Sequence, residues 1–156
     1  MPVHEVVTAR GHPNIKATHK STLEITKDRE VTPRGDCIVG VAADKAPVDF
    51  SEEFKAHLKD HDALLIVVLE ARDVKDVVLA HGHPGLLLTD TRRLIIRKST
   101  YIEPATIGIN ASKSSAELKR ELVTLLKNSE TVLIAHLYVL RLDEITSIYA
   151  SSRRVL

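Results

Sequence analysis

The chain has 156 residues, a length that allows one domain or two very small ones. Hydrophobic residues make up 44% and charged residues 28%, and the formal net charge is only +1. This mixture is ordinary for a globular protein, and the balanced charge gives no sign of nucleic-acid binding. The chain contains no Gln, and avoidance of heat-labile side chains is a tendency of hyperthermophile proteins.

The N-terminus has no charged segment followed by an apolar one, so we expect no secretory signal. The longest apolar runs, such as residues 63–69, have the length of a strand and fall short of the ~20 residues of a membrane span. The lone Cys37 excludes an internal disulfide and a zinc site with several cysteines. We therefore expect a cytoplasmic protein that does not contact a membrane.

An internal repeat organises the chain. Residues 3–13 read VHEVVTARGHP, and residues 74–84 read VKDVVLAHGHP. The similarity continues past this block, interrupted by three extra residues, Arg34, Gly35 and Asp36, in the first half. We interpret the chain as one domain over residues 1–156, made of copy one (3–72), copy two (74–142) and a short C-terminal tail (143–156).

The two copies predict the same elements in the same order. Each begins with a Val-rich strand that stops at a Gly-His-Pro turn, because proline cannot donate to a sheet. The expected strands are residues 3–10, 17–27, 37–43 and 63–71 in copy one, and 74–80, 92–98, 106–111 and 131–140 in copy two. The expected helices, residues 47–60 and 115–128, carry apolar stripes that need a sheet to cover. Ser114 and Glu117 form a capping box at the second helix.

The expected fold class is α+β, with two β-β-β-α-β units related by a pseudo-twofold axis. Each unit is too short to bury much core alone, so we expect the units to share one mixed, mostly antiparallel sheet or a barrel. Residues 72–73 leave only a tight connection, which predicts that the strands on either side are antiparallel neighbours. The strand–helix–strand part should be a right-handed crossover if its strands are parallel and share a sheet.

The repeat separates residues that serve the fold from candidates for function, since features found in both copies are expected to be structural. His12 and His83 occur in both, either as turn residues bonded to local backbone or as a symmetric pair of ligand-binding histidines. Lys45 and Lys113 are also shared, and each precedes a helix start. The free N–H groups at a helix start, beside a lysine, predict a binding site for a phosphate-type anion. The alternative is a solvated lysine.

The main candidate site lies in copy one and combines polar residues unique to that copy with the histidines and lysines that both copies share. We expect His12, His19 and Asp36 to serve proton transfer. The expected ligand-binding residues are Asn14, Lys20, Arg34, Asp44, Lys45, His83 and Lys113. The alternative is a solvated strand face with a Gly-Asp turn.

Two further patterns in the chain could indicate chemistry. Cys37 is interpreted as a small core residue, with a nucleophile as the alternative. His81 and His83 form an H-x-H pair, but only His83 is repeated, so no metal site is predicted.

The main functional hypothesis is therefore a protein that binds a small molecule or a phosphate-type anion through copy one. Whether it is an enzyme, and with which cofactor, is left open. The alternative is an RNA- or protein-binding module that uses basic clusters and an apolar run of copy two. These are Arg92-Arg93, Arg97-Lys98, Arg153-Arg154 and Leu86-Leu87-Leu88. The few aromatic residues disfavour binding of single strands by stacking.

Several strings in copy one resemble an archaeal family catalogued as a domain of unknown function, number 371. They are GHPNI at residues 11–15, Thr18-His19, TLEIT at 22–26 and RGDCIVGV at 34–41. The likeness covers most of the chain and is densest in residues 9–45. It implies an archaeal cytoplasmic protein, which agrees with the missing Gln, and it transfers no activity, cofactor or catalytic residue.

Overall fold

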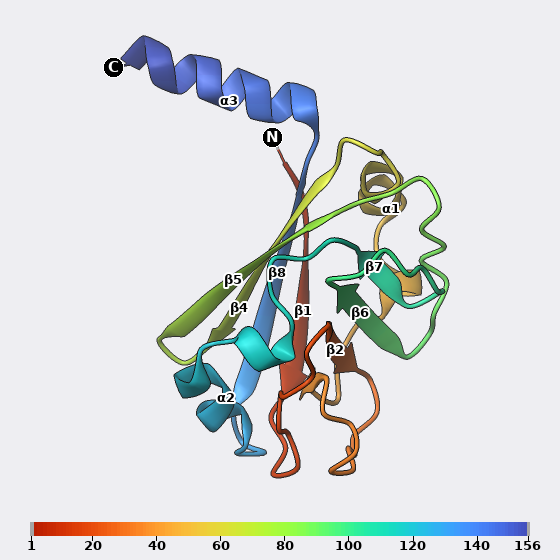
Figure 1. The fold of residues 1–156 in the computed structure, drawn as a ribbon, viewed down its shortest axis with the longest axis vertical. Helices are drawn as coiled ribbons and strands as arrows, with labels where there is room; N and C mark the ends of the chain where they lie inside the picture. The colour runs from red at the N-terminus through yellow and green to blue at the C-terminus, as the bar shows by residue number, and fades with distance from the viewer. Residues whose placement is uncertain (1, 156) are drawn as a thin grey trace.

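The strands form two four-stranded sheets that pack face to face in a computed structural model, which describes residues 2–155 (Figure 1). The strands are β1 (Val3–Arg10), β2 (Thr22–Thr26), β3 (Ile38–Gly40), β4 (Leu64–Ala71), β5 (Val74–His81), β6 (Arg93–Arg97), β7 (Thr106–Gly108) and β8 (Val132–Leu140). The helices are α1 (Glu52–Leu58), α2 (Arg120–Leu126) and α3 (Leu142–Val155). The α+β class is therefore confirmed.

The first sheet has the order β1-β8-β4-β5 and is antiparallel throughout. Its centre is the long pairing of β4 with β8, in which Val67 lies opposite Leu137. Strand β5 follows β4 through a tight turn at Arg72, whose φ of 56° lies in the left-handed region. The predicted antiparallel connection at residues 72–73 is confirmed.

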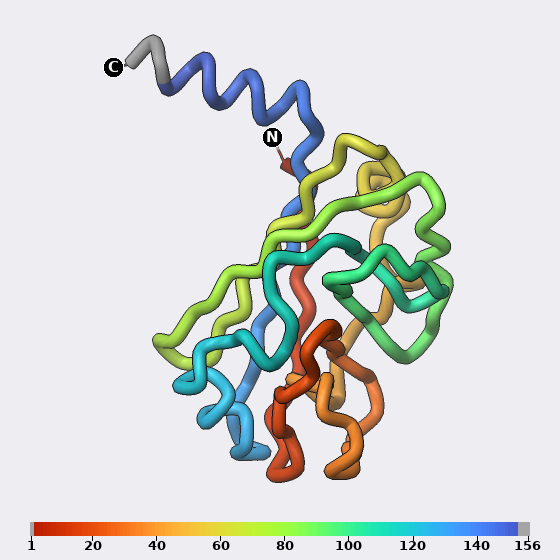
Figure 2. The backbone as a smooth tube through the Cα atoms, viewed as in Figure 1, coloured from red at the N-terminus to blue at the C-terminus, as the bar shows by residue number. Residues whose placement is uncertain are grey.

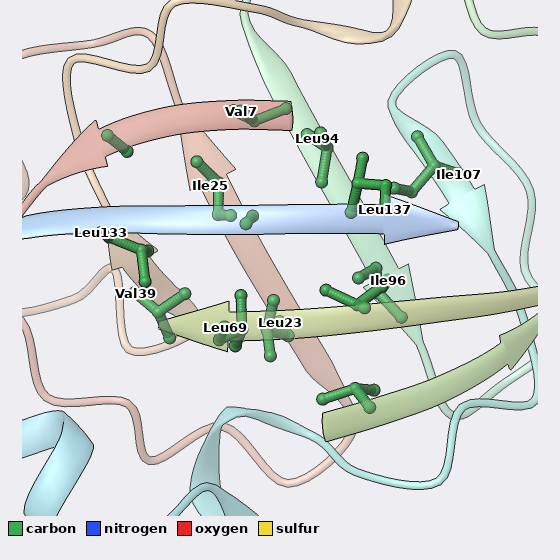
Figure 3. Close-up of a cluster of buried hydrophobic side chains, with 14 of the residues drawn as sticks. Val7, Leu23, Ile25, Val39, Leu69, Leu94, Ile96, Ile107, Leu133 and Leu137 are labelled. Atoms are coloured by element: carbon green, nitrogen blue, oxygen red, sulfur yellow. The ribbon is translucent and has the colours of Figure 1, made fainter. Parts of the chain in front are cut away.

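The core lies between the two sheets, because strict alternation turns one face of each strand of the first sheet inward. Figure 3 shows the buried side chains that meet there. Leu69, Leu133 and Leu137 come from the first sheet, while Leu23 and Ile96 come from the second. All five are fully buried, so the inner faces of the two sheets stabilise each other.

The expectation of one shared sheet or a barrel is wrong. In the second sheet, β2 pairs antiparallel with β6, and each of these pairs on its other side with a short parallel strand, β3 or β7. Between the two sheets, the described residues form two isolated bridges, Arg10 to Val41 and His81 to Ile109. Directly after these bridges, Ala42 and Asn110 have φ values of 52° and 51°, which turn the chain away before a ladder can extend. The sheets therefore do not close.

This arrangement also alters the expected crossovers. Strands β3 and β4 lie in different sheets, and so do β7 and β8. The condition for a right-handed crossover within one sheet is therefore not met.

Each expected helix is split into two pieces. Residues 47–60 form a 3₁₀ turn (Pro47–Asp49) followed by α1, because Phe50 has extended backbone with a ψ of 151°. Residues 115–128 repeat this pattern with a 3₁₀ turn (Ser115–Glu117), extended Leu118 and then α2. In the predicted capping box, the Glu117 carboxylate accepts a hydrogen bond from the Ser114 amide at 3.2 Å. The apolar stripe is kept, but its backbone is not one continuous helix.

Other boundaries also differ from expectation. The strand expected at residues 17–27 begins only at Thr22, because residues 17–21 form a bonded turn that starts with Ala17 at a φ of 49°. The tail expected at residues 143–156 contains α3, which leaves the body at the end of β8 (Figure 2). Leu156 lies outside the described residues.

A buried carboxylate fastens α1 to the edge strand β1. Glu5 is 8% exposed, and its carboxylate accepts hydrogen bonds from Lys45 Nζ and from the Ser51 amide, both at 2.6 Å. Ser51 is the N-cap residue of α1, so the carboxylate satisfies a free N–H group at the helix start. Burial raises the pKa of Glu5, but the hydrogen bonds from Lys45 and Ser51 outweigh it, and the pKa lies below its ordinary value of 4.5.

An equivalent carboxylate fastens α2 to the other edge strand, β5. Asp76 is 3% exposed and accepts hydrogen bonds from Lys113 Nζ at 2.6 Å and from the amide of Lys119, the N-cap residue of α2, at 2.8 Å. Burial raises the pKa of Asp76, but these hydrogen bonds again leave it below the ordinary value of 3.8. Each helix is thus tied to an edge strand by a buried ion pair.

We expect Glu5→Gln to lower the free energy of unfolding by about 2 kcal/mol at pH 7, because half-buried Lys45 loses its charged partner. The Glu5 carboxylate ionises more easily in the folded chain than in the unfolded chain. Its contribution is therefore present above pH 4.5 and is lost as the pH falls through the lowered pKa of the folded state. Urea unfolding of the wild type and of Glu5→Gln should give a difference in the free energy of unfolding that becomes smaller as the pH falls below 4.5.

The control is Glu52→Gln, which makes the same chemical change at a side chain that is 93% exposed. This variant should stay within about 0.5 kcal/mol of the wild type. If Glu5→Gln were as stable as Glu52→Gln at pH 7, Glu5 would not anchor α1.

Candidate functional site

The two Gly-His-Pro turns have the same internal hydrogen bond. His12 Nδ1 accepts from the Asn14 amide at 3.0 Å, and His83 Nδ1 accepts from the Gly85 amide at 2.8 Å. This is the local backbone bonding that one interpretation expected of both histidines. The turns lie at the ends of different helices, because the His12 amide donates to Leu126 of α2 and the His83 amide donates to Leu58 of α1. His12 and His83 therefore do not share one site.

Glycine is required before each of these histidines by close backbone approach. A Cβ at Gly11 would collide with the carbonyl oxygens of Asn128 and Leu126, and one at Gly82 with that of Leu58. The Gly-His-Pro motif is thus a docking turn against the C-terminal end of a helix. This explains why both halves of the chain contain it.

Two loops of the N-terminal half are tied side by side (Figure 1). We call residues 11–21 and 27–37 together the loop surface. His12 Nε2 lies 2.9 Å from a Glu30 carboxylate oxygen, and Asn14 Nδ2 donates to the Val31 carbonyl at 2.9 Å. Both side chains therefore hold the second loop against the first.

His19 and Asp36 meet within the loop surface through the backbone. The Asp36 carbonyl accepts from the amides of Thr18 at 2.9 Å and His19 at 3.2 Å. His19 Nδ1 accepts from the amides of Ser21 and Thr22, both at 3.1 Å. In the described part of the chain, no hydrogen bond joins the His19 imidazole to the Asp36 carboxylate. The role of His12, His19 and Asp36 in proton transfer stays a prediction.

Asp44, Lys45 and Lys113 make their side-chain contacts outside the loop surface. Lys45 and Lys113 bind the buried carboxylates of Glu5 and Asp76, so the protein itself supplies the anions at the two helix starts. Asp44 Oδ1 accepts from the Thr8 amide on edge strand β1 at 2.9 Å. His83 lies at the turn beside α1. In the described part of the chain, none of these four side chains has a hydrogen bond or ion pair with His12 or His19, and their role as ligand-binding residues stays a prediction.

Four of the five Lys and Arg side chains of the loop surface have no ion-pair partner among the described residues, while Lys27 Nζ lies 2.7 Å from an Asp49 carboxylate oxygen. Lys16, Lys20, Arg29 and Arg34 are exposed, and within residues 2–155 their side chains form neither an ion pair nor a hydrogen bond. Lys20 and Arg34 were expected to bind ligand. Lys16 was noted as a polar residue unique to copy one, with Leu87 at the equivalent position, but was not among the expected ligand-binding residues. Arg29 was missed, although the repeat could have indicated it, since Thr100 stands at the equivalent position.

The basic clusters expected to bind RNA are neutralised by carboxylates. Arg92 donates two hydrogen bonds to Asp28 at 3.1 and 2.8 Å. Arg97 binds Glu103 at 2.9 Å, and Lys98 Nζ lies 2.6 Å from a Glu117 oxygen. Arg93 lies 3.8 and 3.6 Å from carboxylate oxygens of Asp90 and Glu103. The side chains of Arg153 and Arg154 lie outside the described residues.

The apolar run of copy two mostly belongs to the core. Leu86 and Leu88 are 2% and 1% exposed, and only Leu87 reaches the surface, with 50% exposed. A contact surface built from this run would therefore have a single apolar side chain.

A buried carboxylate of the second sheet lies beside a half-buried thiol. Glu24 is 7% exposed, and Cys37 Sγ lies 3.8 Å from its Oε1. Burial raises the pKa of Glu24, and the charge of Arg93 only partly opposes this. Burial, with the charges of Glu24 and Asp36, raises the pKa of Cys37 to about 12. The thiol is therefore a poor nucleophile at neutral pH.

We expect Cys37 to react with iodoacetamide about 1,000-fold more slowly in the folded protein than in urea at pH 8, because its thiolate is correspondingly scarcer. Mass spectrometry over a time course gives both rates. Equal rates in the two states would contradict a raised pKa of Cys37.

Neither a metal cluster nor an enclosed cavity marks the loop surface. Among the side chains that the structure describes, no group of three His, Cys, Asp or Glu could hold a metal ion. Three surface depressions are lined by other residues, two of them beside the start of α3 and one around Glu70 and Ile134. Within residues 2–155, no helix is long and apolar enough to span a membrane.

The sequence matches known proteins over most of its length. It is 45% identical over 128 residues to the protein named "Uncharacterized protein MJ0206" from Methanocaldococcus jannaschii, covering 82% of this chain and 94% of that relative. Residues 7–140 match the model of DUF371, described as a domain of unknown function. The matched segment contains both sheets, α1, α2 and the loop surface. The resemblance noted in the sequence is therefore confirmed, and the chain belongs to the DUF371 family.

Proposed function

We propose that the protein binds a phosphate-type anion at the loop surface. The observation that carries this proposal is the group of cations without ion-pair partners, Lys16, Lys20, Arg29 and Arg34. Of the three carboxylates in the same loops, Glu30 is bound to His12 and Asp28 to Arg92, which leaves Asp36 without an ion-pair partner among the described residues. Four unpaired cations against one unpaired carboxylate leave the loops with an excess of positive charge.

The contrast with the second sheet supports this choice of site. On β6 and just beyond it, Arg93, Arg97 and Lys98 each lie within 4 Å of a carboxylate, so their charge is balanced inside the protein. An external anion gains less from a cation that already has a partner, because it must compete with that partner. The loop surface is thus favoured over the basic clusters.

The hydrogen bonds between the two loops support a partly preorganised site. His12 with Glu30, Asn14 with Val31, and the Asp36 carbonyl fix the loop backbones relative to each other. A ligand that binds four cations on fixed loops orders only their side chains, which lowers the entropic cost of binding. A ligand with several negative charges, such as a polyphosphate, matches this arrangement best.

We also propose that the halves are copies of one β-β-β-α-β unit, and that only the first kept a binding surface. Equivalent hydrogen bonds support this, such as His12 N to Leu126 O and His83 N to Leu58 O. The positions equivalent to Lys16, Lys20 and Arg29 hold Leu87, Thr91 and Thr100 in the second half. At these three positions the second half would therefore give the same scaffold without the cations.

Tripolyphosphate is the probe for this proposal, titrated by calorimetry at low ionic strength. We expect the triple variant Lys16→Glu/Lys20→Glu/Arg34→Glu to bind at least about 10-fold more weakly, since each exposed ion pair contributes up to about 1 kcal/mol. Binding should also weaken as salt is added, because the contact is electrostatic.

The matched control is Lys59→Glu/Arg72→Glu/Lys127→Glu. It makes the same change in net charge at exposed cations that also have no ion-pair partner in the described part of the chain. Its affinity should stay within about twofold of the wild type. Absence of tripolyphosphate binding by the wild type, or equal loss in both triple variants, would refute a site at the loop surface.

A further inference from the structure

The outer face of the first sheet is apolar across all four of its strands. The register aligns its side chains in rows: Leu79, Ile66, Tyr138 and His4 form one, and Val77, Val68, His136 and Val6 form the next. Val77 and Leu79 are 44% and 42% exposed, and the members on β4 and β8 are partly exposed. Side chains from non-adjacent segments thus form one continuous apolar surface, rather than the scattered apolar residues of an ordinary surface.

The second sheet shows the opposite pattern on its outer face. There Thr22, Glu24 and Thr26 of β2 are polar, and all three are at most 7% exposed. The first sheet therefore exposes apolar side chains where the second buries polar ones. Antiparallel sheets with one solvated face normally carry polar residues on that face, so the outer face of the first sheet has the composition of a covered surface.

Most charged groups on this face are paired within it. Glu70 lies 3.3 Å from His136 Nε2 and 3.5 Å from Lys75 Nζ. His4 stacks on Tyr138 with ring centroids 5.6 Å apart. Arg10, exposed at the end of β1, has no ion-pair partner among the described residues. A second identical face would therefore meet apolar rows and mostly paired charges, with one unpaired cation at the end of β1.

The dimensions of the face fit a dimer. Strands of eight residues extend for about 27 Å, and four strands at their usual spacing span about 19 Å. Two such faces in contact would cover about 1,000 Å² in total, which is the lower size of a stable specific interface.

Helix α3 also exposes apolar side chains. It follows β8 after a single residue and points away from the body in Figure 1, with Leu142 and Ile148 exposed by 56% and 53%. Its 14 residues span about 21 Å, close to the width of the sheet. A second copy packed on the face would lie beside this helix, and its contact with α3 would raise the buried area further.

We propose that the outer face of the first sheet, formed by β1, β8, β4 and β5, is the interface of a homodimer in which it packs on the same face of a second copy. The contact is isologous, so each row of one protomer meets a row of its partner. This surface is separate from the loop surface, and the proposal does not depend on anion binding.

Sedimentation velocity over a range of about 1 to 200 µM tests this inference. The wild type should sediment with the mass of two chains at the upper concentrations. Val77→Glu/Leu79→Glu should dimerise at least about 100-fold more weakly, because the interface would then bury four unpaired carboxylates, two from each protomer. Both positions are already exposed on an edge strand, so the monomer should fold, and circular dichroism checks that it does. Val77→Lys serves the same purpose if the double variant does not fold.

The matched control is Leu87→Glu, which places a carboxylate at an equally exposed leucine outside the face. It should dimerise like the wild type. A wild-type protein that stays monomeric throughout the concentration range would overturn the proposal. In that case α3 of the same chain or a different protein would cover the face. A dimer that persists in Val77→Glu/Leu79→Glu, or is lost equally in Leu87→Glu, would overturn it as well.

Discussion

The buried carboxylates of Glu5 and Asp76 fix how α1 and α2 pack on the first sheet. A buried charge is tolerated only with compensating partners, and each carboxylate has a lysine and a helix-start amide. Because β1 and β5 are the two edges of the sheet, these contacts place α1 and α2 at opposite edges. The Gly-His-Pro turns then pack against the C-terminal ends of these helices. This contact fixes where the loops begin.

This arrangement decides which charges are left for a ligand. Lysines that precede a helix look like anion-binding residues in the sequence, but here strands β1 and β5 supply the anions. The basic clusters around β6 are balanced in the same way by Asp28, Glu103 and Glu117. What distinguishes the loop surface is therefore not the number of its cations but that four of them lack ion-pair partners among the described residues. Whether a cation has a partner depends on where folding brings carboxylates from distant parts of the chain.

Local rules predicted the elements whose patterns are strong. The strand expected at residues 63–71 is observed at Leu64–Ala71, and the turn at residues 72–73 joins antiparallel neighbours as expected. The sequence predicted where the two helices lie, but it did not predict their breaks at Phe50 and Leu118. An apolar stripe has the same spacing in a continuous helix as in a 3₁₀ turn followed by a short helix. The single sheet was wrong because the choice of hydrogen-bonding partner for short strands such as β3 is a long-range decision.

By itself, the sequence determined the alternation that buries one face of each long strand. It also placed Gly11 and Gly82 where the end of a helix packs too closely for a larger residue. It also determined the asymmetry in charge between the two halves. These features depend on residue type and spacing along the chain. Only the tertiary structure decided that the strands divide into two sheets and that Lys45 and Lys113 bind internal carboxylates. It also showed that the outer face of the first sheet is apolar over four strands, because pairing and burial depend on residues far apart in the chain.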